Sequence, residues 1–431
     1  MKKFFSVILI GSLFLGLYAS DDDFFFSDDS MFFEETIEEF VPDTENQKES
    51  TIFDFGIVET DSVSFGGSTS FSLDFSSIWL DAFSSGNDKD YWFKGFENSS
   101  LAPNMFASLH FDARPNEALR FYGKTEVSYP NNSNQPIFQF KVKELFTDFN
   151  VGEHSYYRFG KHTVKWGVGY FFSPADVINI GKIDPENPEN QVEGAVSLRS
   201  MYTFSGNQNC LYLYLIPDES FLAKNTAFAG KYDFLVGNSE IGVGACLRYN
   251  RPPRLVSTLT TTLFKNYSVF GEGVLAYGTE EQWLESSNKD LVFQGTLGFS
   301  RSFSKQKINL LAQYLFNGFG VDNPTDLDDI TFLSKAMLYN NIGKHYLAVS
   351  LSKSELFTKK LSVSGLCLMS FSDFSGMGNL NFNVNLNNNC NISFGPSLIF
   401  GKENAEYTRI YGIKEGLLQF KASVKLGGGK F

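Results

Sequence analysis

Residues 379–387 alternate strictly between asparagine and an apolar side chain, and this pattern constrains the fold more than any other. The apolar members are Leu380, Phe382, Val384 and Leu386. Successive side chains of a β-strand point to opposite faces, so a strand here has one apolar face and one amide face. A half-buried strand of a soluble protein rarely carries amides at every polar position. The pattern therefore favours a strand in a wall that has lipid on one side and water on the other.

The same alternation returns along most of the chain, in segments with about the ten residues that a tilted strand needs to cross a bilayer. Clear examples are residues 69–75, 119–129, 241–248, 308–317, 347–353 and 418–426. Between Phe138 and Phe149 the apolar set switches from even to odd positions near Glu144, which predicts a β-bulge or a wrong boundary. Around residues 332–339 neither set of alternate positions is wholly apolar or wholly polar.

The connections also alternate, between tight turns and longer loops. Tight turns are expected at 115–117, 206–208, 237–238, 265–266, 304–305 and 343–344, and long loops at 76–105, 130–136, 165–195, 217–225, 278–290 and 318–330. Tight turns on one rim and long loops on the other are typical of outer-membrane barrels. We therefore expect an all-β, transmembrane, antiparallel up-and-down β-barrel of about 18 strands, with 16 and 20 allowed.

The first residues have the features of an export signal. Lys2 and Lys3 precede an apolar run over residues 4–17, and a plausible cleavage site follows Ala19. We interpret residues 1–19 as a secretory signal peptide that is cleaved before the protein reaches the outer membrane.

An acidic, aromatic-rich segment follows over residues 20–60, and the barrel is expected over residues 61–431. Residues 21–49 hold twelve carboxylates and one lysine, so most of the net charge of −13 lies in this segment. The segment is expected to lie in the periplasm or to plug the barrel, with a disordered tail as the alternative. No basic face indicates a nucleic-acid partner, so the expected partners are membrane lipid and small solutes. The sequence has no decisive signal of a subunit interface, and a homo-oligomer is kept as an alternative to a monomer.

Polar residues of the alternating segments form the predicted inner face of the barrel. Charges are tolerated in a lumen, whereas a charge at mid-depth on the lipid side costs ~2–4 kcal/mol. The set could line an aqueous pore of mixed charge, with a mild anion preference from its excess of bases, or form salt bridges that fill a closed lumen. The predicted pore-lining residues are Arg120, Lys124, Glu126, Arg199, Lys231, Asp233, Glu240, Arg248, Glu272, Lys353, Asn381, Asn383, Asn385, Lys421 and Lys425.

The most distinctive loop follows the strand-like sequence Y-Y-R-F-G-K-H at residues 156–162 and opens with W-G-V-G-Y-F-F-S-P at Trp166. This segment resembles porin-like outer-membrane barrels, in which a strand with a Gly-Lys or Gly-Arg pair leads into a Trp-Gly loop rich in Pro, Asp and Asn. The resemblance covers residues 156–199 and implies no particular solute. In such barrels a long loop often folds into the lumen; the alternative is an ordinary extracellular cap. The resemblance implies a constriction lined by Trp166, Tyr170, Asp176 and Asn179.

The four cysteines are expected to be free thiols. Strand parity places Cys210 and Cys246 on the inner face with one strand between them, and Cys367 and Cys390 on the outer face, also with one strand between them. Two strand spacings amount to about 10 Å, beyond the ~7 Å that a disulfide can bridge.

The sequence lacks enzyme signatures. His110, His154, His162 and His345 are scattered without metal-ligand spacing, and neither a G-x-S-x-G motif nor a phosphate-binding loop occurs. We expect no enzymatic activity, no metal and no cofactor. The predicted function is that of an outer-membrane porin or diffusion channel for small polar solutes. The alternatives are an outer-membrane transporter of apolar compounds and a closed surface barrel with an adhesin or structural role.

Overall fold

The computed structural model describes residues 63–81, 98–129, 138–179, 183–185, 192–206, 208–218, 222–249, 251–263, 267–387 and 389–430. The expected signal peptide and the acidic segment lie outside the described residues.

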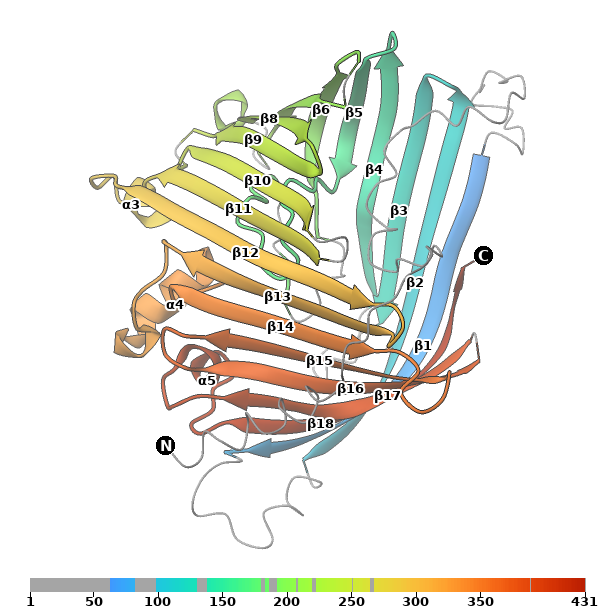
Figure 1. The fold of residues 1–431 in the computed structure, drawn as a ribbon, viewed down its shortest axis with the longest axis vertical. Helices are drawn as coiled ribbons and strands as arrows, with labels where there is room; N and C mark the ends of the chain where they lie inside the picture. The colour runs from blue at the N-terminus through green and yellow to red at the C-terminus, as the bar shows by residue number, and fades with distance from the viewer. Residues whose placement is uncertain are drawn as a thin grey trace, which may run out of the picture. The chain divides into compact units, whose positions relative to one another are not determined.

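A single sheet of eighteen antiparallel strands makes up the described part of the chain, with each strand beside its neighbours in sequence (Figure 1). The last strand pairs with the first, from Leu80 opposite Leu417 to Ser68 opposite Lys430, so the sheet closes into a barrel. The predicted fold class and strand number are confirmed. The strands are β1 (Val63–Leu80), β2 (Ser99–Asn116), β3 (Leu119–Tyr129), β4 (Gln139–Val151), β5 (Ser155–His162), β6 (Ala195–Thr203), β7 (Cys210–Ile216), β8 (Ala227–Val236), β9 (Ser239–Leu247), β10 (Arg254–Leu263), β11 (Tyr267–Tyr277), β12 (Leu291–Phe303), β13 (Ile308–Asn317), β14 (His345–Lys353), β15 (Leu361–Ser370), β16 (Gly376–Asn387), β17 (Cys390–Phe400) and β18 (Leu417–Lys430).

The barrel has two different rims. Short connections, such as 117–118, 237–238 and 304–307, join even-numbered strands to the next odd-numbered strand at one rim, which we call the turn rim. Mostly longer connections, such as 163–194 and 318–344, join the strands at the other rim, which we call the loop rim. The expected order of tight and long connections is therefore present.

Short helices occur in the connections of the described residues. They are η1 (Ala223–Asn225), α3 (Glu280–Leu284), η2 (Pro324–Asp326), α4 (Asp329–Leu338) and α5 (Glu406–Ile410). None of them is long and apolar enough to cross a membrane.

One expected turn is wrong. Residues 343–344 belong to the end of the long connection between β13 and β14, because β14 begins only at His345. The region around 332–339, where neither face was clean, is mostly the helix α4. Asp328 starts this helix, since its side chain accepts a hydrogen bond from the backbone N–H of Thr331 at 2.8 Å.

Strand pairing shows which side chains share a face. On β16, Leu380 and Leu386 are 41% and 44% exposed on the outer face, while Asn381 and Asn383 lie opposite Ser364 and Ser362 on the inner face. The bulge near Glu144 is also present: Lys124 pairs with Glu144 and Thr125 with Val142, which leaves an extra residue on β4 between them. An apolar outer face and a polar inner face are the arrangement that lets a closed barrel span a membrane.

The four cysteines are free, as predicted. Cys210 on β7 is separated from Cys246 on β9 by β8, and Cys367 on β15 is separated from Cys390 on β17 by β16.

Candidate pore constriction

The connection between β5 and β6 turns into the barrel. We call its described residues 163–179 the lumen loop. Side chains on the inner faces of β8, β11 and β13 hold this loop in place, and these strands lie between two and seven positions along the barrel from β6. A segment outside the barrel could not reach these side chains, so the lumen loop crosses part of the interior.

Glu272, at mid-length of β11, is one of the two main anchors of the lumen loop. Its carboxylate is 6% exposed and accepts hydrogen bonds from several donors of the loop. The donors are the backbone N–H groups of Val168 at 2.6 Å, Gly169 at 2.5 Å and Ala175 at 2.8 Å, and the hydroxyl group of Ser173 at 3.0 Å. A buried donor left without an acceptor costs about 1–3 kcal/mol, so a carboxyl group that accepts from four loop donors fixes the loop backbone firmly.

Gln313, on the inner face of β13, is the second main anchor. Its Oε1 atom accepts hydrogen bonds from the backbone N–H groups of Tyr170 at 3.1 Å and Phe171 at 2.8 Å. Its amide group donates to the carbonyl of Phe172 at 2.5 Å and to the hydroxyl oxygen of Thr296 at 2.8 Å. The side chain is therefore satisfied at both ends, as a buried amide must be.

Two smaller contacts complete the attachment. The ammonium group of Lys231 on β8 donates to the carbonyl oxygen of Trp166 at 3.0 Å. The side chain of Asn179 closes the loop on itself, because it accepts from the backbone N–H of Val164 at 2.9 Å and donates to the carbonyl oxygen of the same residue. It also donates to Asp176 at 2.9 Å.

Apolar packing covers the inner wall beneath the loop. Trp166, Ala175 and Ile178 form a buried cluster with side chains of β7, β8, β10 and β11, and the rings of Trp166 and Tyr214 lie 5.7 Å apart. Phe171 and Phe172 pack in a second cluster with residues of β13 to β17. The lumen loop thus fills one side of the interior with a small hydrophobic core.

Ion pairs between side chains attach the end of the β5–β6 connection to the barrel wall. Glu193, just before β6, bridges Lys141 on β4 at 2.7 Å and Lys161 on β5 at 2.8 Å. The hydrogen bonds from these two ammonium groups lower the pKa of Glu193 to about 2.

The charges on the wall of β2 to β5 are largely paired with one another. Arg120 is 3% exposed and binds Asp112 through two hydrogen bonds of 3.0 and 2.8 Å. Arg158 binds Asp148 in the same two-pronged way, at 2.6 and 2.9 Å. Paired charges of this kind leave little net field for a passing solute.

The two lysines of β18 differ from these paired charges. Lys421 lies opposite Gly395 and Ser76, and Lys425 lies opposite Asn391 and Ser72. Both lysines are exposed. Neither forms an ion pair or a side-chain hydrogen bond with the residues that the structure describes.

The strand register places most of the expected pore-lining residues on the inner face. It gives the position of each side chain and assigns it no role in transport. Those on the inner face are Arg120, Lys124, Glu126, Arg199, Lys231, Asp233, Glu240, Glu272, Asn381, Asn383, Asn385, Lys421 and Lys425. Arg248 lies one residue beyond β9, at the loop rim.

Lys353 is misplaced in the prediction. It pairs with Ile308 and Val363 on the outer face and has the same parity as Leu351. Its ammonium group reaches the turn rim and donates to the carbonyl oxygen of Gln306 at 3.0 Å. A long lysine side chain can lie on an apolar face in this way, because its charged end extends to the aqueous rim.

The four expected constriction residues all lie on the lumen loop. Trp166 is 2% exposed and packs against the wall, so it does not face open water. Tyr170, Asp176 and Asn179 are half-buried. Desolvation of the carboxyl group, helped by the nearby charge of Glu272, raises the pKa of Asp176 to about 7 against the hydrogen bonds from Asn179.

The role of Gln313 was not expected from the sequence. Parity alone places it inward, but its partners on the lumen loop are 141–143 residues earlier in the chain, and they are backbone groups without a sequence signature. Among the described residues, no group of three or more His, Cys, Asp or Glu side chains could hold a metal ion.

A second buried carboxylate, at the loop rim, lies where the β13–β14, β15–β16 and β17–β18 connections meet. Glu406 of α5 is 2% exposed and accepts hydrogen bonds from the N–H groups of Ile342 at 3.0 Å and Gly343 at 3.2 Å and from the hydroxyl of Tyr346 at 2.6 Å. Its own backbone N–H donates to Asp373 at 2.6 Å. Burial outweighs these favourable bonds and raises the pKa of Glu406 to about 7.

The loop rim is therefore expected to lose stability as pH rises. A folded-state pKa of about 7 against an ordinary value of 4.5 means that the Glu406 contribution is fully present below pH 4.5 and is lost as pH passes 7. The difference amounts to about 3 kcal/mol for this one group. Hydrogen exchange of residues 401–416, corrected for intrinsic rates, should be slower at pH 5.5 than at pH 8. Glu406→Gln should flatten this dependence, and an unchanged slope in that variant would contradict the assignment.

Comparison with known proteins gives a likeness of fold. No family model and no curated protein matches the chain. An OccD1 (OprD) double mutant has 8% identity and a TM-score of 0.48, with 84% of this chain and 95% of that chain covered. OccK11 (OpdR) of Pseudomonas aeruginosa has 7% identity and a TM-score of 0.47, with 84% and 96% covered. A mutant of the Rh. blastica porin has 8% identity and a TM-score of 0.42, with 85% and 99% covered.

These similar structures thus include a porin and the OprD protein. At these identities the likeness concerns the fold alone. The closed barrel with its apolar outer face is the architecture of an outer-membrane channel.

Proposed function

We propose that this protein is a diffusion channel of the outer membrane for small polar solutes, narrowed by the lumen loop. The observation that carries the proposal is the anchoring of this loop by Glu272 and Gln313 inside the barrel. The loop packs against apolar parts of the inner wall, whereas Asn379, Asn381 and Asn383 of β16 and Lys421 and Lys425 of β18 are polar side chains of that wall. Transport through such a lumen would be passive and would depend on its width and fixed charges.

Polar cargo is favoured over apolar cargo by the chemistry of the uncovered wall. Asn379, Asn381 and Asn383 of β16 share the inner face with Lys421 and Lys425 of β18. Inward apolar side chains of β13 to β17, such as Leu315 and Leu368, pack with Phe171 and Phe172 of the lumen loop instead. An apolar compound would have to cross the amide and ammonium groups at a desolvation cost.

A mild anion preference is part of the proposal. The acids and bases of β2 to β5 are mostly paired, whereas the two lysines of β18 are exposed. We also infer that residues 1–19 direct export and are cleaved, and that residues 20–60 act at the periplasmic side of the barrel or inside it.

Planar-bilayer recording of the purified, refolded protein tests the proposed function. We expect steady ohmic steps, because an aqueous lumen conducts ions without a gating reaction. Swelling of liposomes should then occur with small polar solutes and be absent with apolar ones. Silence of both the mature chain and a variant without residues 20–60 would contradict the channel and favour a closed surface barrel.

A further inference from the structure

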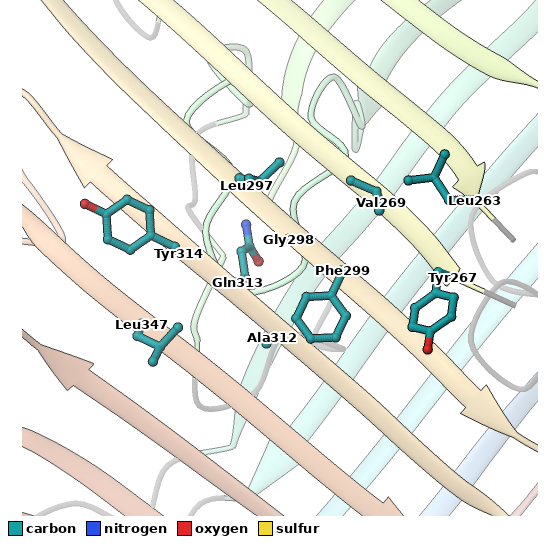
Figure 2. A pocket seen from close by; sticks show the side chains of 10 residues that line it. All are labelled: Leu263, Tyr267, Val269, Leu297, Gly298, Phe299, Ala312, Gln313, Tyr314 and Leu347. Atoms are coloured by element: carbon teal, nitrogen blue, oxygen red, sulfur yellow. The ribbon is translucent and has the colours of Figure 1, made fainter. Parts of the chain in front are cut away.

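An apolar groove crosses the outer face of β10 to β14. It has a volume of about 630 Å³ and lies around Gly298 and Ala312. Leu263, Tyr267, Val269, Leu297, Phe299, Tyr314 and Leu347 form its walls, as Figure 2 shows. The groove exists because the small side chain of Ala312 lies between Phe299 and Val349, its partners on the neighbouring strands.

The groove faces away from the lumen. Leu263, Leu297 and Phe299 are 43%, 60% and 39% exposed although they are large and apolar. In a barrel that spans a membrane, such side chains face hydrocarbon, so the groove opens into the lipid. It extends from Tyr267, the first residue of β11 at the turn rim, toward Tyr314 near the middle of β13.

Arg301 lies at the turn-rim end of the groove, on the same outer face. It pairs with Tyr267 and Leu310. Its guanidinium group lies over the rings of Tyr267 at 4.4 Å and Phe303 at 4.2 Å, and it donates a hydrogen bond to the Tyr267 hydroxyl. Its Nε atom is buried without a hydrogen-bond partner. Within the described residues, Arg301 forms no ion pair with a carboxylate.

Further bases gather at the turn rim beside Arg301. Residues 301–307 and 353–360 contain six bases and a single carboxylate, Glu355. The two turns are neighbours, since the backbone N–H of Ser354 donates to the carbonyl oxygen of Lys307 at 2.9 Å. Glu355 is occupied by Lys307, at 2.6 Å. This edge of the barrel therefore carries a clear excess of positive charge.

The dimensions of groove and edge fit one leaflet of a bilayer. Leu297 and Arg301 are four positions apart in sequence, which is about 13 Å along a strand. Half of the hydrocarbon core of a bilayer is about 15 Å thick. An apolar chain in the groove would therefore end at the level of the headgroups, where Arg301 and the turn-rim lysines lie.

We propose that this groove and the adjoining basic edge bind an anionic phospholipid of the periplasmic leaflet. One acyl chain lies in the groove over Ala312, and the phosphate group is held by Arg301 and the bases of residues 301–307 and 353–360. The orientation follows from the short connections, which face the periplasm in outer-membrane barrels. Basic clusters beside apolar membrane surfaces are suited to anionic headgroups.

Charge complementarity favours a lipid over a second copy of the chain. A two-fold contact would bring the same patch of both barrels together, and with it the six bases of each copy. Like charges placed opposite one another destabilise a contact. An anionic headgroup neutralises the same charges.

Native mass spectrometry of the full mature chain in detergent tests the proposal. Dimyristoyl phosphatidylglycerol and dimyristoyl phosphatidylcholine have the same acyl chains and differ in headgroup charge. The wild type should retain one molecule of the glycerol lipid in clear preference to the choline lipid. Loss of one base near an anionic surface weakens association about fivefold, so Arg301→Gln should reduce the preference by about that factor.

Substitutions in the groove test the place of the acyl chain. Ala312→Phe should weaken retention of both lipids, because the new ring fills the groove. Ala422→Phe on the outer face of β18 adds the same ring away from the groove, and Lys402→Gln removes a base at the loop rim. Both controls should bind lipid as the wild type does, and circular dichroism with heat-modifiable electrophoretic mobility should show all four variants folded.

Three results would overturn the proposal. The first is equal retention of the two lipids by the wild type. The second is an equal effect of Ala312→Phe and Ala422→Phe. The third is a dimer mass that Ala312→Phe abolishes, since the groove would then hold a second barrel.

Discussion

Replacing Glu272 by alanine is expected to widen the channel and to raise its single-channel conductance. The substitution removes the acceptor of three backbone N–H groups of the lumen loop and of the Ser173 hydroxyl. Buried donors without an acceptor cost about 1–3 kcal/mol each, so the anchored position of the loop loses several kcal/mol. A constriction dominates the resistance of a pore, and its release should raise conductance about twofold or more.

Gln313 should limit the effect of this single substitution. It still holds the backbone of Tyr170, Phe171 and Phe172 when Glu272 is absent. The double variant Glu272→Ala/Gln313→Ala is therefore expected to show a larger conductance than either single variant, together with greater open-channel noise. Bilayer recordings at high salt measure these differences with little influence of surface charge.

Glu240→Ala is the matched control for this experiment. Glu240 is also an inward carboxylate, and it lies opposite Leu235 and Thr260, near the turn rim. It makes no contact with the lumen loop among the described residues. Both variants remove an inward carboxyl group, so an equal rise in conductance for both would contradict the anchoring role of Glu272.

The barrel could be predicted from sequence because its signal is local. Alternation with a period of two indicates which face each side chain occupies, and the change of parity near Glu144 predicted a bulge or a wrong boundary, of which the bulge on β4 is present. The signal was weakest in the long connection 318–344. There α4 begins at a side-chain cap on Asp328, and its pattern over 332–339 matched neither face of a strand.

The constriction could be predicted only in part. Strand parity placed Glu272 and Lys231 inward and the resemblance suggested an inward loop, but neither indicated which wall side chains bind it. Glu272 meets backbone donors 97–104 residues away, and any loop sequence provides such donors. Trp166 was expected to line the constriction and is instead packed against Tyr214, because an indole ring gains more from burial than from contact with water.

Neutralising the two lysines of β18 is expected to remove most of the anion preference. Lys421 and Lys425 are exposed on the inner wall. A unit charge about 8 Å away in water contributes about 0.5 kcal/mol, so two such charges change an ion preference about fivefold. The double variant Lys421→Gln/Lys425→Gln should lower the anion-to-cation permeability ratio by about that factor, measured as the reversal potential in a salt gradient. The effect should shrink as salt rises, because the Debye length falls from about 10 Å at 0.1 M to about 3 Å at 1 M.

Lys353→Gln separates a lumen effect from a general loss of positive charge. Lys353 lies on the outer face, where its partner is a backbone carbonyl at the turn rim. Its removal should leave the reversal potential unchanged, whereas Lys421→Glu/Lys425→Glu should reverse the preference toward cations. If Lys353→Gln shifted the potential as much as the β18 variants do, selectivity would arise from charge at the rim. Lys421 and Lys425 on the lumen wall of β18 would then not determine the ion selectivity.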